Sequence, residues 1–282
     1  MKPTDKVTPQ KLWNMKATGD KIAMVTAYDY PTAMLAEKTG LDIILVGDSL
    51  GTVVLGHDTP VPVTVDAIIH HTKAVTRGTK APMVVADMPF MSYHISREQA
   101  LTNAARLIQE GGADAVKLEG GAEAAPTVKA LADAGIPVMA HIGLMPQRAS
   151  IEGSFRVQGR DADTAAAILD DAEALGDAGA FSVVLEFVTA EAAEAITNSV
   201  EMPTIGIGSG PTCDGQVLVL HDLLGVYDEA PPFAHPYADL NTVITKALTE
   251  YRDDVRSAKY PGENHTVHMK PGEAEKLKKK RG

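Results

Sequence analysis

The sequence predicts a single (β/α)8 barrel, and three observations support this fold class. The chain has 282 residues, which fits one barrel of about 250 residues followed by a tail. Short apolar runs rich in β-branched residues alternate with longer helical patterns, without a Ser/Gly-rich linker between them. The runs are continuously apolar, as in IILV at residues 43–46, which is typical of parallel strands buried on both faces.

Eight strands are predicted, in chain order Ile22–Ala27, Ile43–Val46, Met83–Ala86, Ala115–Leu118, Pro137–His141, Ser182–Glu186, Thr204–Ile207 and Gln216–Leu220. Between them, Ser96 and Gln99 form a capping-box pattern, and Ile168, Ala172 and Leu175 recur at helical spacing. Glycines in GGADAV, AGIPVM and AGAFSV end helices just before a strand. Eight strands favour closure into a barrel, although an open doubly wound sheet would give a similar pattern.

Composition narrows the class of protein. The formal net charge of −11 argues against nucleic acid as a partner, since phosphate binding needs a basic surface. No apolar run approaches the ~20 residues of a membrane helix, and the N-terminus lacks the apolar segment of a secretory signal. With one cysteine, Cys213, the chain has no internal disulfide. We therefore expect a soluble, cytoplasmic protein.

The chain divides into a catalytic domain and a tail. We expect residues 1–268 to form one barrel domain that includes the N-terminal segment. Residues 269–282 are expected to be a basic, disordered tail, because they end in KLKKKR at residues 276–281. We assign this tail no binding role.

Polar residues follow the predicted strands, at the face that carries active sites in (β/α)8 barrels. They are Asp29, Asp48, Asp87, Glu119, His141, Glu186 and Asp222. One such acid is often only a helix cap. However, Asp48, Asp87 and Glu119 close three consecutive strands, so their carboxylates should converge on one sector of the barrel mouth.

Three converging carboxylates indicate a bound cation, because they would otherwise repel one another. An all-oxygen ligand set without cysteine favours Mg²⁺ over zinc, and Mn²⁺ could substitute. The predicted metal ligands are therefore Asp48, Asp87 and Glu119.

Lys117 and Glu186 are the other two candidates for chemistry. Lys117 lies two residues before Glu119, so both side chains should point to the barrel interior. It could clamp an anionic substrate, form a Schiff base or make a structural salt bridge, and the acidic neighbours disfavour the Schiff base. Glu186, in the apolar setting FSVVLEF across the barrel from the acidic residues, is the candidate general base, with helix capping as the alternative.

The glycine-rich segment GIGSG at residues 206–210 follows the seventh strand. It resembles a phosphate-binding turn, but it could equally leave room for a large flat cofactor. The chain has no P-loop motif. We do not expect Cys213 beside this segment to be a catalytic thiol.

Many of these residues lie in blocks that resemble the ketopantoate hydroxymethyltransferase family. The blocks are TAYDY at residues 26–30, VGDSLG at 46–51, PVTVD at 62–66, ADMPFMSY at 86–93, VKLEGG at 116–121, HIGLMPQ at 141–147, VQGR at 157–160, LEFV at 185–188, IGIGSG at 205–210, DGQVLVLHD at 214–222 and YPGENH at 260–265. The resemblance departs at Met145, where the family has Thr, and in the tail after His268.

The resemblance implies a barrel of the phosphoenolpyruvate/pyruvate type and a specific reaction. A hydroxymethyl group would pass from 5,10-methylenetetrahydrofolate to 3-methyl-2-oxobutanoate through an enolate stabilised by Mg²⁺, giving 2-dehydropantoate for pantothenate biosynthesis. By position, Asp48, Ser49, Asp87 and Lys117 would bind the 2-oxo acid, and Glu186 would take its proton. The folate contacts stay unassigned, and the family implies a homo-oligomer, a decamer.

Two other functions stay open on the sequence alone. A carbon–carbon lyase of the same barrel type would use the same enolate without folate. A non-catalytic barrel would bind an anionic metabolite, and its acidic residues would then be caps and salt bridges.

Overall fold

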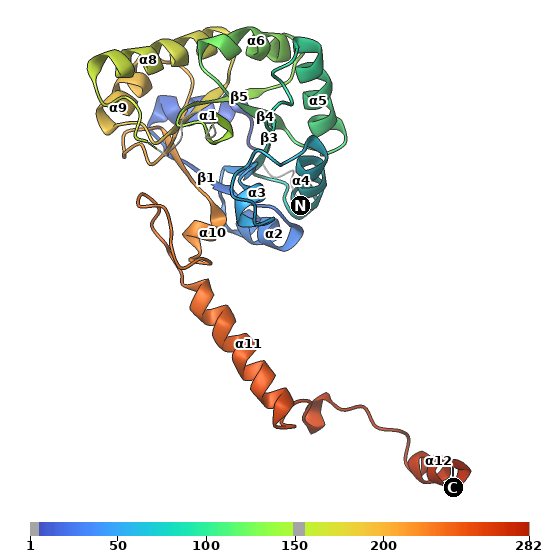
Figure 1. Ribbon diagram of the computed structural model, residues 1–282. Helices are drawn as coiled ribbons and strands as arrows, with labels where there is room; N and C mark the ends of the chain where they lie inside the picture. Colours follow the sequence, from blue (N-terminus) through green and yellow to red (C-terminus); the bar gives the residue numbers. More distant parts are fainter. Residues whose placement is uncertain (1–5, 149–155, 282) are drawn as a thin grey trace.

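The computed structural model describes residues 6–148 and 156–281, and eight parallel strands in it close into a barrel (Figure 1). The strands are β1 (Ile22–Thr26), β2 (Ile43–Val46), β3 (Met83–Asp87), β4 (Ala115–Glu119), β5 (Val138–Gly143), β6 (Ser182–Glu186), β7 (Thr204–Ile207) and β8 (Gly215–Leu218). Each strand pairs with the next along the chain, and β8 pairs with β1. The barrel prediction is therefore confirmed, and the open sheet is excluded.

The predicted strands are all present, but several of their ends differ. β3 and β4 extend to Asp87 and Glu119 because the pairing continues there, with Asp87 opposite Lys117 and Glu119 opposite His141. Each acid is thus the last residue of its strand, held by ladder hydrogen bonds. β8 ends before Leu220, which begins a short helix, α10.

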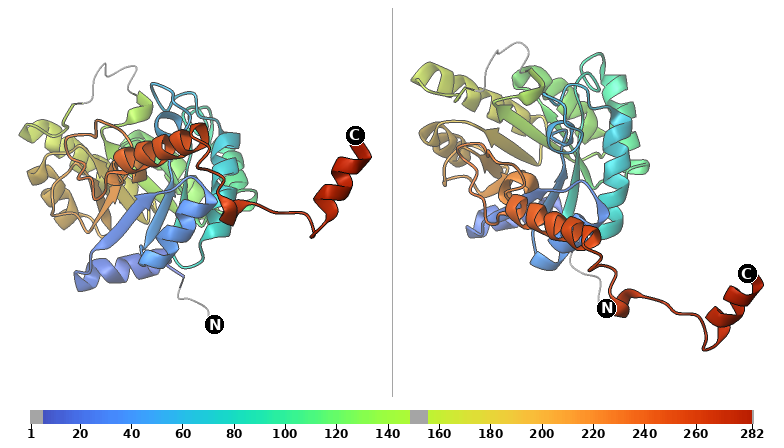
Figure 2. Two further views of the ribbon diagram at one scale, coloured as in Figure 1. Left: turned by 90° about the horizontal axis from the view of Figure 1, so that it is seen from below. Right: turned by 60° about the horizontal axis from the view of Figure 1, so that its bottom comes forward.

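Helices surround the barrel (Figure 2). The longer ones are α1 (Pro9–Thr18), α2 (Tyr30–Thr39), α4 (Val65–Gly78), α5 (Arg97–Gln109), α6 (Ala125–Asp133), α8 (Ala162–Asp177), α9 (Ala190–Ser199), α11 (Leu240–Arg256) and α12 (Glu273–Arg281). Short turns of helix are α3 (Leu50–Val53), η1 (Ala122–Ala124), η2 (Pro146–Arg148), α10 (Leu220–Leu223) and η3 (Glu263–His265). The predicted start of α5 is confirmed, since the Ser96 hydroxyl accepts a hydrogen bond from the Gln99 backbone N–H at 3.1 Å. The capping box is not completed, because the Gln99 side chain accepts from the Ile95 N–H and not from the Ser96 N–H.

Two apolar cores hold the barrel together. One lies between the helices and the outside of the sheet, and includes the predicted α8 residues Ile168, Ala172 and Leu175. The other fills the barrel interior and is closed at its amino-terminal end by α1, whose Leu12 is fully buried there. The indole N–H of Trp13 on α1 donates to the Phe181 carbonyl just before β6, at 2.8 Å. With that end closed, the carboxyl ends of the strands are the open face.

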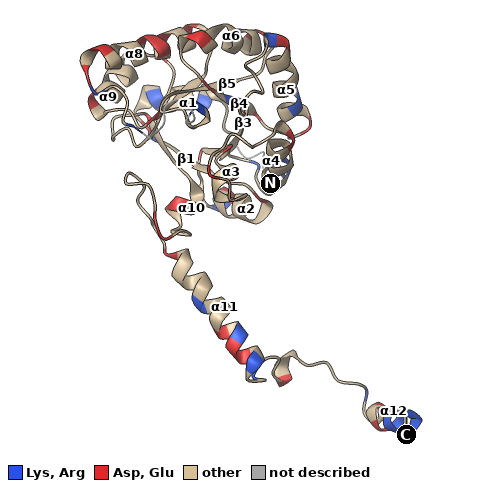
Figure 3. Ribbon diagram, viewed as in Figure 1, with Lys and Arg blue, Asp and Glu red and all other residues tan. Residues whose placement is uncertain are grey.

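The C-terminal part of the chain leaves the barrel. After α10, helix α11 extends away from the body of the molecule as an arm (Figure 1), and it has no buried residue. The arm ends in α12, where lysines and an arginine gather (Figure 3). We expected no regular structure after residue 268, whereas the structure forms α12, in which Lys276 pairs with Glu273 one turn away. Within the described residues, no helix has the length and apolar character needed to cross a membrane.

Candidate active site

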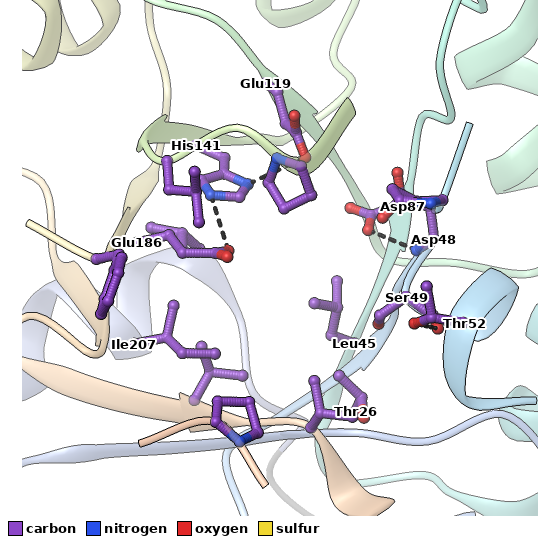
Figure 4. A pocket seen from close by; sticks show the side chains of 18 of the residues that line it. Thr26, Leu45, Asp48, Ser49, Thr52, Asp87, Glu119, His141, Glu186 and Ile207 are labelled. Atoms are coloured by element: carbon purple, nitrogen blue, oxygen red, sulfur yellow. Dashed lines mark hydrogen bonds and ion pairs between the residues drawn. The ribbon is translucent and has the colours of Figure 1, made fainter. Parts of the chain in front are cut away.

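A cavity of about 570 Å³ opens at the carboxyl ends of the strands. All six residues proposed from the sequence line it, namely Asp48, Ser49, Asp87, Lys117, Glu119 and Glu186. Figure 4 shows Asp48, Asp87 and Ser49 on one side of this cavity and Glu186 with His141 on the other. The expected convergence of polar strand ends is therefore present in the structure.

Asp87 and Lys117 form a buried ion pair on neighbouring strands, with Oδ1 and Nζ 2.9 Å apart. The other carboxylate oxygen of Asp87 accepts a hydrogen bond from the Asp48 backbone N–H at 2.8 Å. Burial alone would lower the pKa of Lys117, but the carboxylates of Asp87, Glu119 and Asp48 outweigh burial and raise that pKa. Lys117 is therefore a charged ammonium, which suits anion binding and not Schiff-base formation.

Asp48 and Glu119 are buried around the Gln147 side chain and backbone. The Gln147 amide donates to Asp48 Oδ2 at 2.8 Å, and the Gln147 backbone N–H donates to Glu119 Oε2 at 3.1 Å. Burial and the nearby Asp87 carboxylate raise the pKa of Asp48 to about 7. Burial and the Asp48 carboxylate raise the pKa of Glu119 well above its ordinary value. Both groups lack sufficient positive charge around them.

Ser49 lines the cavity next to Asp48 and contacts the buried Tyr28. Their hydroxyl oxygens are 2.8 Å apart and share a hydrogen bond. Ser49 begins α3 but makes no side-chain cap there, so its hydroxyl is not committed to the helix and can face the cavity.

His141 connects the acidic side of the cavity with Glu186. Its Nδ1 lies 3.2 Å from the Lys117 ammonium, and its Nε2 lies 3.2 Å from Glu186 Oε2. Burial and the Lys117 charge lower the pKa of His141, so its ring is neutral. Because an ammonium only donates, Nδ1 accepts and the ring proton sits on Nε2, which lies close to Glu186 but is not hydrogen-bonded to it. Glu186 is thus linked to the acidic residues, although we expected it to stand apart from them.

The other polar residues at strand ends have different places. Asp29 caps α2, where its carboxylate accepts from the Thr32 N–H at 2.8 Å. Asp222 lies in α10 and lines the cavity. Cys213 is buried and is not among the residues that line the cavity.

A family model described as ketopantoate hydroxymethyltransferase matches residues 6–263. The chain belongs to this family. A 3-methyl-2-oxobutanoate hydroxymethyltransferase of Carboxydothermus hydrogenoformans is 56% identical over 274 residues, which are 97% of this chain and 99% of the relative. One of the same name from Aeropyrum pernix is 53% identical and covers 95% of this chain and 97% of its own. Like these relatives, the chain is a transferase.

Solved structures with a similar fold are more distant in sequence. A phosphonopyruvate hydrolase in complex with oxalate and Mg²⁺ has a TM-score of 0.59 at 13% identity, over 97% of this chain and 95% of its own. A 2,3-dimethylmalate lyase, described as a phosphoenolpyruvate mutase/isocitrate lyase superfamily member, has a TM-score of 0.58 at 16% identity, over 97% and 98%. These structures share the (β/α)8 barrel fold of this ketopantoate hydroxymethyltransferase family member.

The carboxylates do not form a ready metal cage. Within the described residues, no group of three or more His, Cys, Asp or Glu side chains is arranged so that it could hold a metal ion. The reason is visible in the contacts, since Lys117 and the Asp48 N–H occupy the Asp87 oxygens. A cation would have to replace or supplement these donors.

Several residues in or beside the cavity were not singled out from the sequence. Gln147 lies in the block HIGLMPQ, but its contact with both acids depends on how the loop after β5 folds back. Phe187 and Phe233 line the cavity itself. Phe233 comes from the segment between α10 and α11, whose return to the barrel mouth leaves no periodic signal in the sequence.

Proposed function

We propose that this chain transfers a hydroxymethyl group from 5,10-methylenetetrahydrofolate to 3-methyl-2-oxobutanoate, with Mg²⁺, giving 2-dehydropantoate in pantothenate biosynthesis. The acid and the transferred group are those in the names of the relatives. The observation that carries the proposal is a single cavity in which one ammonium and three buried carboxylates face a separate, less buried glutamate. We also propose a cytoplasmic location, an expectation that rests on the sequence.

The acidic side of the cavity has an excess of negative charge that a bound divalent cation would offset. Asp48, Asp87 and Glu119 offer three negative charges against one positive charge on Lys117, and burial raises the pKa of Asp48 and of Glu119. Asp48 Oδ1 receives no hydrogen bond from the described residues, since Gln147 donates only to Oδ2. These carboxyl oxygens are hard ligands of the kind that Mg²⁺ prefers. When bound there, Mg²⁺ would supply Lewis-acid stabilisation of negative charge on the keto oxygen of the acid.

Lys117 and Ser49 would hold the carboxylate of the 2-oxo acid. Lys117 is fixed by Asp87, so its ammonium is oriented before the acid arrives. The Ser49 hydroxyl can donate to the acid while it accepts from Tyr28. Asp48 and Asp87 would bound the same subsite. The substrate would thus lie with its carboxylate towards β2 and β4.

Glu186 would remove the proton from C3 of the acid. His141 Nε2 lies 3.2 Å from one of the Glu186 oxygens without a hydrogen bond in this structure, and a small adjustment that forms this hydrogen bond would orient the carboxylate. The enolate carbon would form a carbon–carbon bond with the methylene carbon of the donor as the bond from that carbon to one donor nitrogen breaks. Water would then replace the second nitrogen on the same carbon and supply the hydroxyl group. Tetrahydrofolate would leave with the C3 proton and one proton of water on its two freed nitrogens.

We also propose that the protein is a homo-oligomer, held by the arm. α11 exposes Val243, Ile244, Leu248, Tyr251 and Val255, each with 45–62% of its surface in solvent. Most of these recur at spacings of three and four residues, and the polar residues occupy the opposite side of the helix. An apolar stripe of this size on a helix detached from its own barrel fits the surface of a second copy. The decamer stays an expectation from the resemblance.

The proposed role of Glu186 as the general base is tested by measuring the exchange of the C3 proton of the acid. With Mg²⁺ and without donor, the protein should exchange this proton for deuterium in D₂O, as followed by ¹H NMR. Glu186→Gln should slow the exchange by about 100-fold or more, the contribution of a positioned general base. Glu191→Gln, on the exposed first turn of α9, serves as the matched control. Exchange that is equally fast in Glu186→Gln would refute the role of Glu186.

A further inference from the structure

The cavity is larger than a small 2-oxo acid requires. Its volume of about 570 Å³ lies within the roughly 300–1,000 Å³ of pockets that bury much larger, drug-sized ligands. Apart from the polar groups discussed above, the lining of the cavity is largely apolar and includes Leu144, Ile207, Val219, Pro231 and Pro232. A second ligand therefore has room beside the acid, in an apolar compartment.

Phe187 directs an aromatic ring into this apolar part from a strained backbone position. Its φ is +53°, which bulky residues rarely adopt. Two backbone hydrogen bonds fix this conformation. The Phe187 N–H donates to the Ile207 carbonyl, and the Phe187 carbonyl accepts from the Gln158 N–H, each at 2.8 Å. Strain of this kind concentrates at ligand-binding sites. The peptide turn also places the ring directly after the proposed base, Glu186.

Phe233 provides a second ring from a distant part of the chain. The centroids of the Phe187 and Phe233 rings are 5.5 Å apart with an interplanar angle of 53°. Gly208 makes this pair possible, since a Cβ there would lie 2.9 Å from the Phe233 ring and 3.1 Å from the Phe187 ring. Both phenylalanines are only half-buried. Two aromatic rings are thus held at the cavity wall, and part of the surface of each ring is not covered by other residues.

Asp222 adds a carboxylate to the same cavity. It is half-buried in α10, and no described residue donates a hydrogen bond to its carboxylate or forms an ion pair with it. Burial raises the pKa of this carboxyl group. Asp222 does not cap α10. A partly desolvated carboxylate without a donor is suited to a ligand that carries N–H groups.

We propose that the Phe187–Phe233 pair, with Gly208 behind it and the Asp222 carboxylate, binds the flat aminopyrimidinone ring of the one-carbon donor. This inference rests on the proposed function and extends it, since it assigns the donor a subsite separate from that of the acid. Aromatic faces stack on flat heterocycles. An aminopyrimidinone presents adjacent N–H donors that a carboxylate can accept in pairs. Glu186 would lie where the two subsites meet.

The experiment is calorimetric titration of the Mg²⁺-loaded protein with tetrahydrofolate, which lacks the transferable carbon, in the presence of the acid. Phe233→Ala should raise the Kd by about 10- to 100-fold, the effect of removing an aromatic residue stacked on a heterocycle. Phe233→Tyr should retain binding within about three-fold, because the stacking face is kept. Asp222→Asn should raise the Kd by about ten-fold or more, since it removes a charged acceptor. Tyr237→Ala, an exposed aromatic in the same segment that does not line the cavity, is the matched control.

Two readouts separate this inference from the proposed function. Deuterium exchange at C3 of the acid, which needs no donor, should persist in Phe233→Ala, while the KM for 5,10-methylenetetrahydrofolate rises. Wild-type affinity for tetrahydrofolate in both Phe233→Ala and Asp222→Asn, with wild-type product formation, would overturn the inference alone. If a folded Phe233→Ala variant lost both the C3 deuterium exchange and the binding of tetrahydrofolate, the inference would also be overturned, because Phe233 would then serve the acid. A wild-type protein that neither binds tetrahydrofolate nor forms product would overturn both.

Discussion

Asp87 is the residue on which the acidic side of the cavity depends, because it contacts both Lys117 and the Asp48 backbone. Asp87→Asn should weaken Mg²⁺ binding and activity together. We expect the Mg²⁺ concentration for half-maximal activity to rise by about 10- to 100-fold, the range found even for residues that only support metal ligands. Activity titrations against Mg²⁺ measure this. Asp133→Asn, on the exposed surface of α6, is the control, and an unchanged Mg²⁺ requirement in Asp87→Asn would contradict the metal assignment.

The buried carboxyl groups also predict how stability depends on pH. The pKa of Asp48 rises from 3.8 to about 7 in the folded, metal-free protein. Between these two values the folded state binds more protons than the unfolded state, so this group makes the free energy of unfolding fall as the pH rises. The pKa of Glu119 is raised as well and acts in the same direction.

Mg²⁺ should remove that dependence, because it would keep both groups ionised in the folded protein. The increase in Tm caused by saturating Mg²⁺ should therefore be larger at pH 8 than at pH 5. For a protein of this size, each kcal/mol corresponds to roughly 2–4 °C. Thermal unfolding with Mg²⁺ and with chelator at both pH values is the measurement. A stabilisation by Mg²⁺ that is equal at both values would count against cation binding at Asp48 and Glu119.

The sequence predicts the position of a site residue when that residue lies at the end of a strand. Asp48, Asp87, Lys117, Glu119 and Glu186 each follow or close an apolar run, and the parallel barrel brings such ends together. Gln147 and Phe233 could not be placed in this way, since their contacts depend on loops. The positive φ of Phe187 could not be predicted either, because backbone hydrogen bonds to Ile207 and Gln158, two residues distant in sequence from each other, hold it.

Strand β5 ends at a glycine that the neighbouring strand requires. Gly143 has φ +93°, and an added Cβ would overlap the Glu186 carbonyl oxygen and lie 2.6 Å from Val188. Gly143→Ala should lower the free energy of unfolding by about 2–5 kcal/mol, from backbone strain and overpacking. It should also reduce activity, since it displaces the end of β6.

Gly135→Ala is the matched control for this effect. Its φ is +83°, but nothing lies within 4 Å of the added Cβ, so only backbone strain of about 1 kcal/mol is expected. Denaturant unfolding of both variants gives the comparison. Equal midpoints would show that the contact between β5 and β6 is less tight than described.

Helix α11 makes a prediction about assembly. Leu248→Lys places a charge in the middle of the exposed apolar stripe and should reduce the oligomer to a smaller species in sedimentation experiments. Thr249→Lys adds the same charge to the polar side of the helix and should leave the assembly intact. Wild-type protein that sediments as a monomer would contradict the proposed role of α11.

The predictable elements are those with a periodic pattern. All eight strands were found, and α8 was found from its helical spacing. The place of α11 could not be predicted, because an amphipathic pattern shows that a helix has an apolar face but not whether its own barrel covers that face. The helix α12 was missed because Glu–Lys pairs one turn apart support a helix in a segment that we judged only by its charge.

At the scale of the whole molecule, one closed barrel brings the proposed acid site, the proposed base and the proposed donor site to one open face. The amino-terminal end is closed by α1, so all substrates would enter and leave at the carboxyl ends of the strands. The net charge of −11 accompanies a cavity that itself gathers acidic groups, which is compatible with an anionic substrate only if a cation offsets them.

The most direct test of this account is detection of 2-dehydropantoate by mass spectrometry. The purified protein is incubated with 3-methyl-2-oxobutanoate, with or without 5,10-methylenetetrahydrofolate, in Mg²⁺ and in excess chelator. We predict product only when the metal and the folate donor are both present. A folded, metal-loaded protein that forms no product, or one that forms it without folate or without metal, would contradict the proposed reaction.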